Sequence, residues 1–444
     1  MSKLFEKYNI NVPRYTSYPA MPYWNNDMGQ GKWLKFLKKG FVSSNEVDLY
    51  IHIPYCQKLC WYCGCNRVIT KNKDKGAEYV DLIIKEFQIY TQNLPNLVIR
   101  SLHFGGGTPN FLEPKTLEML LSKISPWFHK EQFEGAIEVD PRTSRIEHLE
   151  VLAKYGFKKL SLGIQDFDLG VQKAINRVQP FELVKKVVQA SRELGFEQIN
   201  FDLIWGLPKQ TKETVRETIR LTSELYPDQI SYYSYAHLPQ KFKHQNLIKE
   251  SDILTGKNKR DLYEVGKIDL ESSGYVEIGM DHYAKINGPL HLALKERKLK
   301  RNFMGYAPKK SATLIGLGAS SISSNEFGFI QNQKDLKDYR QSIERGILPV
   351  EKGHANSSQD ILRNDLIQNL MCNLVLAETD IERLGELDDI KNKIEEFEKD
   401  GLLIKGSGQW TATDSGRRFL RCIALAFDEY FPSVKFGSMF SQSV

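Results

Sequence analysis

The feature that most constrains the fold is a regular alternation, between about residues 47 and 335, of short apolar runs with longer amphipathic stretches. The amphipathic stretches repeat apolar residues at helical spacing, as Val184, Val187 and Val188 do. This alternation predicts right-handed βαβ units and a parallel sheet. The apolar runs, interpreted as buried strands, are 49–53, 97–104, 136–139, 160–164, 199–204 and 230–235. Six units predict an α/β fold with an incomplete (β/α)6 parallel barrel, not a closed barrel of eight units.

The segments on either side of this region have a different pattern. Residues 1–45 are rich in proline and aromatic residues and predict an irregular N-terminal arm with one short helix near 32–39. Beyond 335 the alternation stops, and the pattern predicts helices followed by a hairpin of the strands LLIK and QWTAT. We therefore divide the chain into an arm (1–45), a barrel (46–335) and a mainly helical, winged-helix-like C-terminal domain (336–444).

Composition narrows the class of protein. The chain has 444 residues, of which 41% are hydrophobic and 26% charged, as in ordinary globular proteins. No apolar run is long enough for a transmembrane helix, and the first ten residues lack the apolar stretch of a signal peptide. We therefore expect a cytoplasmic protein that does not bind a membrane. The formal net charge of +6 is mild for this length and does not require a nucleic-acid partner.

Cysteine spacing is the most informative local pattern. Four of the six cysteines lie in CQKLCWYCGC, directly after the first predicted strand. In a reducing compartment such a cluster is more typical of a metal site than of disulfides. Structural zinc sites usually take pairs of ligands from two separate segments, and a second pair is missing here. Three close thiolates can hold an iron–sulfur cluster with one iron left open, so that interpretation is favoured, with zinc or redox-active thiols as alternatives.

The spacing Cys-xxx-Cys-xx-Cys after the first barrel strand resembles the radical S-adenosylmethionine (SAM) superfamily. The resemblance implies a 4Fe–4S cluster held by Cys56, Cys60 and Cys63, with the amino and carboxylate groups of SAM on the fourth iron. Cys65 is an extra cysteine, which we expect not to bind iron. We place it, with Tyr50 on the first strand, among the catalytic residues.

Polar and glycine residues at later strand ends match the rest of a SAM site. The glycine loop after the second strand allows close approach of the backbone to a ligand. A carboxylate at the end of the third strand can hold ribose hydroxyls, and Arg177 can pair with the SAM carboxylate. The residues that the resemblance assigns to SAM binding are Gly105, Gly106, Gly107, Thr108, Glu138, Gln165, Arg177 and Asp202.

Along nearly the whole chain the resemblance becomes narrower, to the oxygen-independent coproporphyrinogen III oxidases. The motifs that carry it are PRYTSYP, LYIHIPYCQKLCWYCGCN, LHFGGGTP, IEVDPR, LSLGIQDF, INFDLIWGLPKQT, YAHLP, GYVEIGMDHYA, RNFMGYA and GASSIS. The extra cysteine and the PRYTSYP arm favour this family over the related haem chaperones.

The resemblance implies a reaction in porphyrin and haem biosynthesis. The propionates on rings A and B of coproporphyrinogen III would be oxidatively decarboxylated to vinyl groups, giving protoporphyrinogen IX. A 5′-deoxyadenosyl radical from SAM would take a hydrogen atom from each propionate, which then loses CO₂ and one electron. Cofactors supply such chemistry because general acids and bases cannot break an unactivated C–H bond.

Further cofactors and partners follow from the resemblance alone. A second SAM is expected beside the first, with Ala236 and Ile322 matching positions that line it, and Tyr50 near the first SAM. A one-electron donor such as flavodoxin or ferredoxin is implied, and a monomer is expected. Arg14, Arg301 and Lys209 are candidates for binding substrate carboxylates.

Three other functions remain open at this point. One is a haem chaperone that keeps the cluster without decarboxylation. Another is a radical SAM methyltransferase acting on a tetrapyrrole or aromatic substrate. The third is a DNA-binding regulator that uses the winged-helix-like part, although the sequence has no Arg/Lys-rich recognition helix.

Overall fold

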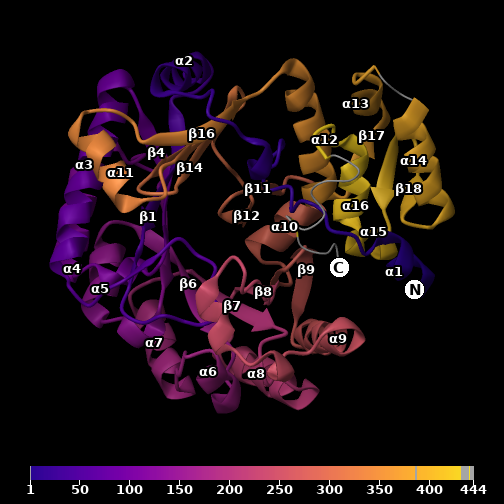
Figure 1. The fold of residues 1–444 in the computed structure, drawn as a ribbon, viewed down its shortest axis with the longest axis horizontal. Coiled ribbons are helices and arrows are strands. Elements are labelled where there is room, and N and C mark those ends of the chain that lie inside the picture. Colours follow the sequence, from indigo (N-terminus) through magenta and orange to yellow (C-terminus); the bar gives the residue numbers. More distant parts are fainter. Residues whose placement is uncertain (1, 386–387, 432–439, 441–444) are drawn as a thin grey trace.

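The computed structural model of the chain describes residues 2–385, 388–431 and 440. All six predicted strands are present and lie side by side in sequence order as a curved parallel sheet (Figure 1). They are β1 (Glu46–Ile53), β4 (Val98–Gly106), β5 (Glu134–Val139), β6 (Phe157–Gln165), β7 (Gln198–Trp205) and β8 (Gln229–Ser234). The predicted βαβ architecture is therefore confirmed.

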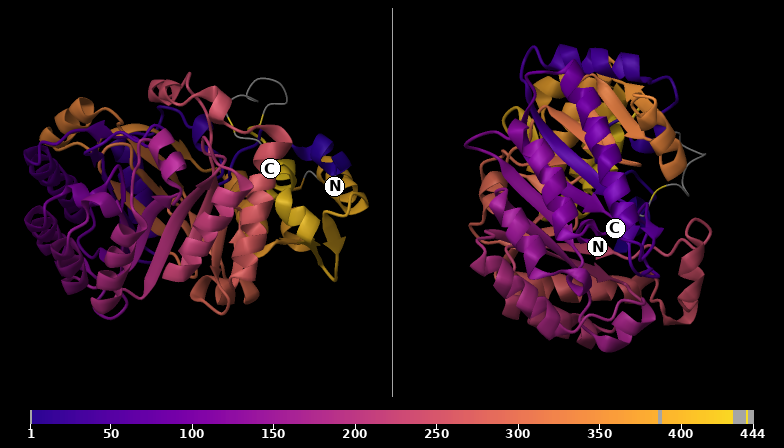
Figure 2. Two further views of the ribbon diagram at one scale, coloured as in Figure 1. Left: turned by 90° about the horizontal axis from the view of Figure 1, so that it is seen from below. Right: turned by 90° about the vertical axis from the view of Figure 1, so that its left-hand side faces the viewer.

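Helices cover the outer face of this sheet (Figures 1 and 2). Most of them match the predicted amphipathic stretches, because their apolar stripe packs on the outward side chains of the strands. On β1 these are Val47, Leu49, Ile51 and Ile53, all fully buried. The covering helices are α3 (Asp74–Asn93), α4 (Pro114–Ile124), α5 (Ile146–Lys154), α6 (Leu169–Ala174), α7 (Phe181–Glu193), α8 (Lys212–Leu225) and α9 (Gly256–Ser272).

The sheet extends beyond the six predicted strands, to twelve in all. On the free side of β1 lie β13 (Thr313–Leu317), β14 (Ile322–Asn325), β15 (Gly328–Asn332) and β16 (Val350–Ala355), and beyond β8 lie β10 (His282–Lys285) and β9 (Tyr275–Gly279). Of these only β13 runs parallel to its inner neighbour. Since β16 and β9 form the two ends of the sheet, the barrel is open, as predicted.

The gap in the barrel is flanked by shorter elements. A hairpin of β11 (Lys300–Asn302) and β12 (Gly305–Ala307) follows α10 (Pro289–Lys295). The hairpin lies between the barrel and the C-terminal helices in Figure 1. On the other side α11 (Leu336–Glu344) packs on α3 and precedes β16. The large sheet thus continues past residue 335, while the division into 1–45, 46–335 and 336–444 stays a prediction.

The C-terminal part combines helices with a small antiparallel sheet, in the order expected of a winged-helix-like domain. Its sheet has the order β17–β19–β18, and the predicted last helix is broken near Phe419. The elements are α12 (Ser358–Asn373), β17 (Val375–Ala377), α13 (Glu378–Glu382), α14 (Asp388–Lys399), β18 (Leu403–Lys405), β19 (Gln409–Ala412), α15 (Asp414–Arg418) and α16 (Leu420–Ala424).

The N-terminal arm packs partly in this C-terminal core and partly, through Trp33 and Leu37 of α2 (Gln30–Gly40), in the core of the barrel. It also contains α1 (Ser2–Tyr8), and between α1 and α2 its buried aromatic and apolar side chains join the core of α12, α14 and α16. Arg421 of α16 donates hydrogen bonds to the carbonyls of Val12 and Pro13. Arg14 forms an ion pair with Asp281, at the turn between β9 and β10. The arm therefore connects the C-terminal domain to the edge of the barrel.

Arg421→Met should release the arm without removing the aliphatic part of the side chain. Buried hydrogen bonds to a charged group contribute about 1.5–3 kcal/mol each, so losing these two should lower the free energy of unfolding by about 3–6 kcal/mol. Limited proteolysis should then cut the chain near Arg14 while the barrel stays intact. An unchanged digestion pattern would contradict this role of Arg421.

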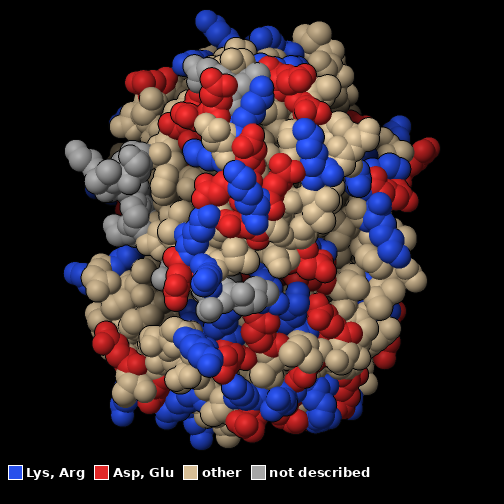
Figure 3. All heavy atoms as spheres, turned by 90° about the vertical axis from the view of Figure 1, so that its right-hand side faces the viewer, with Lys and Arg blue, Asp and Glu red and all other residues tan. Residues whose placement is uncertain are grey.

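The described helices include none that is both long and apolar enough to cross a membrane. Figure 3 shows the face of the C-terminal domain, where lysine and arginine side chains are interspersed with aspartate and glutamate. A mixed surface of this kind does not favour binding to nucleic acid, which prefers a continuous basic patch.

Candidate active site

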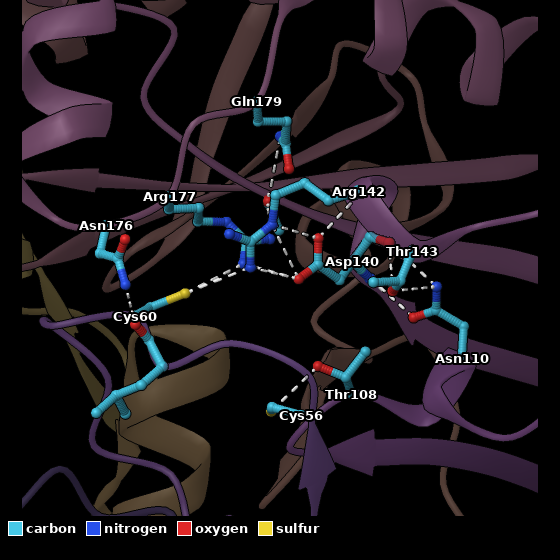
Figure 4. A network of polar contacts seen from close by, with 12 residues as sticks. Cys56, Cys60, Thr108, Asn110, Asp140, Arg142, Thr143, Asn176, Arg177 and Gln179 are labelled. Atoms are coloured by element: carbon cyan, nitrogen blue, oxygen red, sulfur yellow. Dashed lines mark hydrogen bonds and ion pairs between the residues drawn. The ribbon is translucent and has the colours of Figure 1, made fainter. Parts of the chain in front are cut away.

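The cysteine loop lies across the carboxyl ends of the parallel strands, where barrels of this kind build their active sites. It begins directly after β1 and is fastened by pairing between β2 (Tyr55–Cys56) and β3 (Val68–Ile69). The loop is also attached to the segment that follows α6. Trp61 N donates to the carbonyl of Ile175 at 3.0 Å, and Asn176 Nδ2 donates to the carbonyl of Leu59 at 2.8 Å (Figure 4).

One cavity of about 500 Å³ brings most of the predicted site residues together. It lies between the cysteine loop and the ends of β4, β5, β6 and β7. Its lining includes Cys56, Cys60, Cys63, Cys65, Gly106, Gly107, Thr108, Glu138, Gln165, Arg177 and Asp202. Four cysteines and the polar strand ends, which are up to 146 positions apart in the sequence, thus share one space.

Each cysteine of the predicted triad has a different environment. Cys56 Sγ lies 3.2 Å from Thr108 Oγ1, and burial raises the pKa of this thiol to about 11. Cys60 Sγ accepts from Arg142 Nη2 at 3.5 Å and from Arg177 Nη1 at 3.6 Å. A hydrogen bond from Cys65 lowers the pKa of Cys63 to about 6. Positive charge beside Cys60 stabilises a thiolate or an anionic cluster at this end of the cavity.

The two arginines are held by Asp140, at the end of β5 (Figure 4). Its Oδ2 lies 2.7 Å from Arg142 Nη2 and 3.1 Å from Arg177 Nη1. Burial alone would raise the pKa of Asp140, but the charge of Arg177 and the bonds from Arg142 lower it to about 2. The aspartate is therefore ionised and neutralises part of the positive charge around Cys60. Asp140 and Arg142 belong to the EVDPR motif, but the sequence analysis did not single them out.

The glycine loop after β4 approaches the cysteine loop too closely for side chains. A Cβ on Gly105 would lie 2.8 Å from the Tyr50 ring, and one on Gly107 would lie 2.8 Å from the Pro54 backbone and 3.1 Å from Cys56 Sγ. Gly106 has a φ of +116°, which L-residues rarely adopt. The motif is thus required by packing and backbone conformation.

Glu138 lies at the centre of a group of polar side chains below the glycine loop. Its Oε2 accepts from Gly106 N at 3.2 Å, and its Oε1 lies 3.2 Å from His103 Nε2. Tyr50 stacks on His103 with 5.9 Å between ring centroids, and its hydroxyl lies 3.2 Å from His52 Nδ1. These contacts put Tyr50 beside the predicted ribose-binding carboxylate.

Asp202 forms the opposite wall of the cavity. It accepts from Ser161 Oγ at 3.0 Å and Asn200 Nδ2 at 2.9 Å. Burial raises its pKa to about 6, so this carboxyl titrates near neutral pH. A buried carboxylate with spare acceptor capacity suits the hydroxyl groups of a ribose.

Arg177 is already engaged by protein groups. It donates to the carbonyl of Gly163 at 2.6 Å in addition to its contacts with Asp140 and Cys60, while its Nε has no hydrogen-bond partner among the described residues. Its role toward a SAM carboxylate therefore stays a prediction. The predicted site residues outside the cavity lining are Tyr50, Gly105, Ala236 and Ile322.

A second loop, after β8, fastens the cysteine loop from the other side. His244 Nε2 donates to the carbonyl of Cys63 at 2.8 Å, while within the cysteine loop itself Arg67 Nη1 donates to the carbonyl of Cys65 at 2.9 Å. The buried Gln245 Nε2 donates to the carbonyls of Tyr62, at 3.1 Å, and of Ala236, at 3.3 Å. The sequence analysis missed these residues, because no local pattern shows which loop will meet the cysteines.

Replacing Gln245 with alanine should loosen the cysteine loop specifically. The carbonyls of Tyr62 and Ala236 would lose their hydrogen bonds from Gln245. Each lost bond removes about 0.5–1.5 kcal/mol of local stabilisation. We expect faster loss of reconstituted iron to a chelator, measured by visible absorbance, with an unchanged melting temperature of the barrel. Gln88→Ala, at an exposed position of α3, is the matched control and should lose iron at the native rate. Equal rates in both variants would contradict this role.

The residues fit the cofactors that the superfamily implies. The thiols that line one cavity and the two arginines beside Cys60 suit an anionic cluster. The glycine loop, which has no Cβ atoms, leaves its backbone open to a zwitterionic ligand. Within the described residues no three His, Cys, Asp or Glu side chains converge on a single ion. Ligands of a cluster need not do so, because each binds a different iron.

Comparison with known proteins identifies the family. Residues 50–222 match the Radical SAM superfamily. The chain is 37% identical to the oxygen-independent coproporphyrinogen III oxidase of Pseudomonas aeruginosa, over 97% of this chain and 96% of that protein. For the Escherichia coli enzyme of the same name, the identity is 36%, over 96% of this chain and 94% of that protein. The chain belongs to the oxygen-independent coproporphyrinogen III oxidases.

The fold agrees with this assignment. The solved structure of coproporphyrinogen III oxidase from E. coli, described as a radical SAM enzyme, superposes with a TM-score of 0.88 at 35% identity. It covers 95% of this chain and all of that one. The chain is therefore a radical SAM oxidoreductase that uses a 4Fe–4S cluster and SAM. Membership of the oxygen-independent coproporphyrinogen III oxidases favours the oxidase over the chaperone, methyltransferase and regulator alternatives.

Proposed function

We propose that this chain converts coproporphyrinogen III to protoporphyrinogen IX without oxygen, by oxidative decarboxylation of the ring A and ring B propionates to vinyl groups. The observation that carries the proposal is the single cavity that joins the cysteine loop, the glycine loop and the carboxylates of Glu138 and Asp202. The proposal is also supported by the similarity of nearly the full chain to oxygen-independent coproporphyrinogen III oxidases.

The division of labour within the cavity follows from its geometry. Cys56, Cys60 and Cys63 would hold the cluster, while Gly106 and Thr108 present backbone and hydroxyl groups to the amino end of SAM. When bound, the cluster and SAM supply the one-electron chemistry that breaks an unactivated C–H bond. Glu138 and Asp202 would bind and orient the ribose. Tyr50 and Cys65 would act next to the reacting carbon.

Radical chemistry in this cavity would require that water be kept from the reacting atoms. The cysteine loop is pressed onto the strand ends by His244, Gln245 and Asn176. Reactive intermediates survive only where the site excludes competing reactions.

Of the cations considered for substrate carboxylates, Arg14 pairs with Asp281 and Arg301 donates to the Arg14 carbonyl at 2.8 Å. Those two instead hold the arm beside the barrel.

The finer features of this function remain proposals. We infer a second SAM near Ala236, just beyond β8, and Ile322, the first residue of β14. Supporting this, Ala236 is exposed and tied through Gln245 to the cysteine loop. A flavodoxin or ferredoxin would deliver electrons, and we propose a cytoplasmic monomer without nucleic-acid or membrane partners.

Anaerobic reconstitution with iron and sulfide, followed by reduction with SAM and coproporphyrinogen III, tests the proposal. We expect 5′-deoxyadenosine and protoporphyrinogen IX to form together. Tight stoichiometric haem binding without vinyl product would indicate a chaperone, and methyl transfer from labelled SAM would indicate a methyltransferase. Either result would refute the proposed reaction.

A further inference from the structure

Polar side chains point into the open barrel along much of its length. Closed (β/α)8 barrels fill their interior with bulky branched side chains. Here the outward residues of the strands are apolar and buried, as Leu160 and Leu162 are on β6. Inward residues that line the two cavities are Asp48, Ser101, His103, Ala136, Glu138, Lys159, Ser161, Gly163, Asn200, Asp202, Ser231 and Tyr233. The interior is therefore a polar lumen and not a packed core.

A second cavity, of about 360 Å³, occupies the amino-terminal half of this lumen. We call it the amino-end cavity. It is lined by the first residues of β5, β7 and β8 and by the β11–β12 hairpin. Glu138, Asp202 and Tyr233 line both this cavity and the one that contains the cysteines. The two cavities thus meet at the carboxylates proposed to orient SAM.

A β-bulge turns one cation into the amino-end cavity, and strand alternation places a second one there. In β4 the pairing skips Arg100, since Val47 pairs with Ile99 and Asp48 with Ser101. Ile99 and Leu102 remain on the buried outer side, so Arg100 and Ser101 both face the lumen. Bulges re-aim side chains in this way and are common beside active sites.

A second bulge lies in the pairing of β5 with β6, where Gly135 pairs with Phe157 and Ala136 with Lys159. The bulge places Phe157 on the buried outer side, the same side as Leu160 and Leu162. Lys159 and Ser161 alternate with these leucines, so both point to the inner face and line the cavity. Lys309, after β12, also contributes to the lining.

The present partners of these cations are easily exchanged. Lys159 Nζ pairs with Glu134 at 2.6 Å, and Arg100 Nη1 lies 3.9 Å from Glu46 and 3.2 Å from Gln132 Oε1. The side chains of Glu134 and Glu46 are 47% and 37% exposed. The pair of Lys159, itself 30% exposed, contributes only about 0–1 kcal/mol, and the 3.9 Å contact of Arg100, itself 14% exposed, is long, so a ligand carboxylate can replace both at little cost.

We propose that the amino-end cavity receives the unreactive propionates of the tetrapyrrole substrate, which bind to Arg100, Lys159 and Lys309. The reacting propionate extends along the lumen to Glu138, Asp202 and Tyr233, where the cofactor cavity begins. This inference rests on the proposed function and adds where the substrate lies and which groups recognise it. It gives a physical reason why two of four propionates escape reaction, because anchored carboxylates remain at the far end of the lumen.

Binding of coproporphyrin III, the stable oxidised form of the substrate, to the full chain without cluster or SAM tests the site by fluorescence titration. Arg100→Gln and Lys159→Gln should each weaken binding about tenfold. Lys159→Arg should restore it. Lys158→Gln is the matched control, because the neighbouring Lys158 points outward and pairs with Glu197 at 3.6 Å. It should bind within twofold of the native chain.

Native affinity in both Arg100→Gln and Lys159→Gln, with folding verified by circular dichroism, would overturn the inference. In the reconstituted enzyme the same two variants should raise KM for coproporphyrinogen III about tenfold while leaving 5′-deoxyadenosine formation without substrate unchanged. Turnover with native KM in both variants would refute the site but leave the proposed function standing. A different pair of results would refute the proposed function and leave the site standing. In that case the native chain forms no vinyl product, while both variants lose porphyrin binding.

Discussion

Replacing any one of Cys56, Cys60 or Cys63 with alanine should abolish product formation and the visible absorbance of the reconstituted cluster. Each change would remove one of the three cysteines that we expect to hold the cluster. We expect product formation to fall at least about a thousandfold, which corresponds to about 4 kcal/mol of transition-state stabilisation. Iron content and the yield of 5′-deoxyadenosine should fall together.

Cys65→Ala is the informative comparison. Cys65 lines the same cavity and hydrogen bonds to Cys63, yet we expect it not to bind iron. This variant should keep the iron content and absorbance of the native enzyme while losing turnover. A Cys65→Ala protein that cannot assemble a cluster, or a Cys60→Ala protein that still does, would contradict the assignment of the ligands.

Asp140→Asn should destabilise the fold and disorder the surroundings of Cys60. The change keeps the shape of the side chain but leaves Arg177, only 6% exposed, beside a neutral group. Removing one partner of a buried ion pair costs about 3–5 kcal/mol. We expect a loss of that order in the free energy of unfolding, measured by denaturant titration, and slower SAM cleavage in the loaded enzyme.

The pH dependence gives this prediction a second readout. The pKa of Asp140 is lowered from 3.8 to about 2, so its stabilising effect is complete above about pH 4 and is lost as the pH falls toward 2. The stability difference between native and variant should therefore be constant from pH 5 to 8. Asp261→Asn, in an exposed pair with Lys212, is the control and should cost less than about 1 kcal/mol. Equal losses in the two variants would contradict the role of Asp140.

Much of the cofactor site could be predicted from local patterns because strand ends in a parallel barrel meet at one face. The apolar runs predicted the strands, and the residues directly after them, such as Gly106, Glu138 and Asp202, then had to lie near the cysteines. Four predicted residues lie outside the lining of the cysteine cavity: Tyr50 and Gly105 on β1 and β4, Ala236 beyond β8, and Ile322 on β14. The placement of Ala236 and Ile322 depends on a loop and on a strand outside the six predicted ones.

By itself the sequence determined the open α/β barrel and the position of its cysteine loop, because hydrophobic periodicity and residue spacing act locally. Only the tertiary structure decided that Asp140 would hold two arginines against Cys60, that Gln245 would fasten the cysteine loop, and that the arm would complete the C-terminal core. The inward turn of Arg100 likewise depends on a bulge between two strands. Such contacts join residues far apart in the chain, and their formation depends on packing in three dimensions, which no local pattern records.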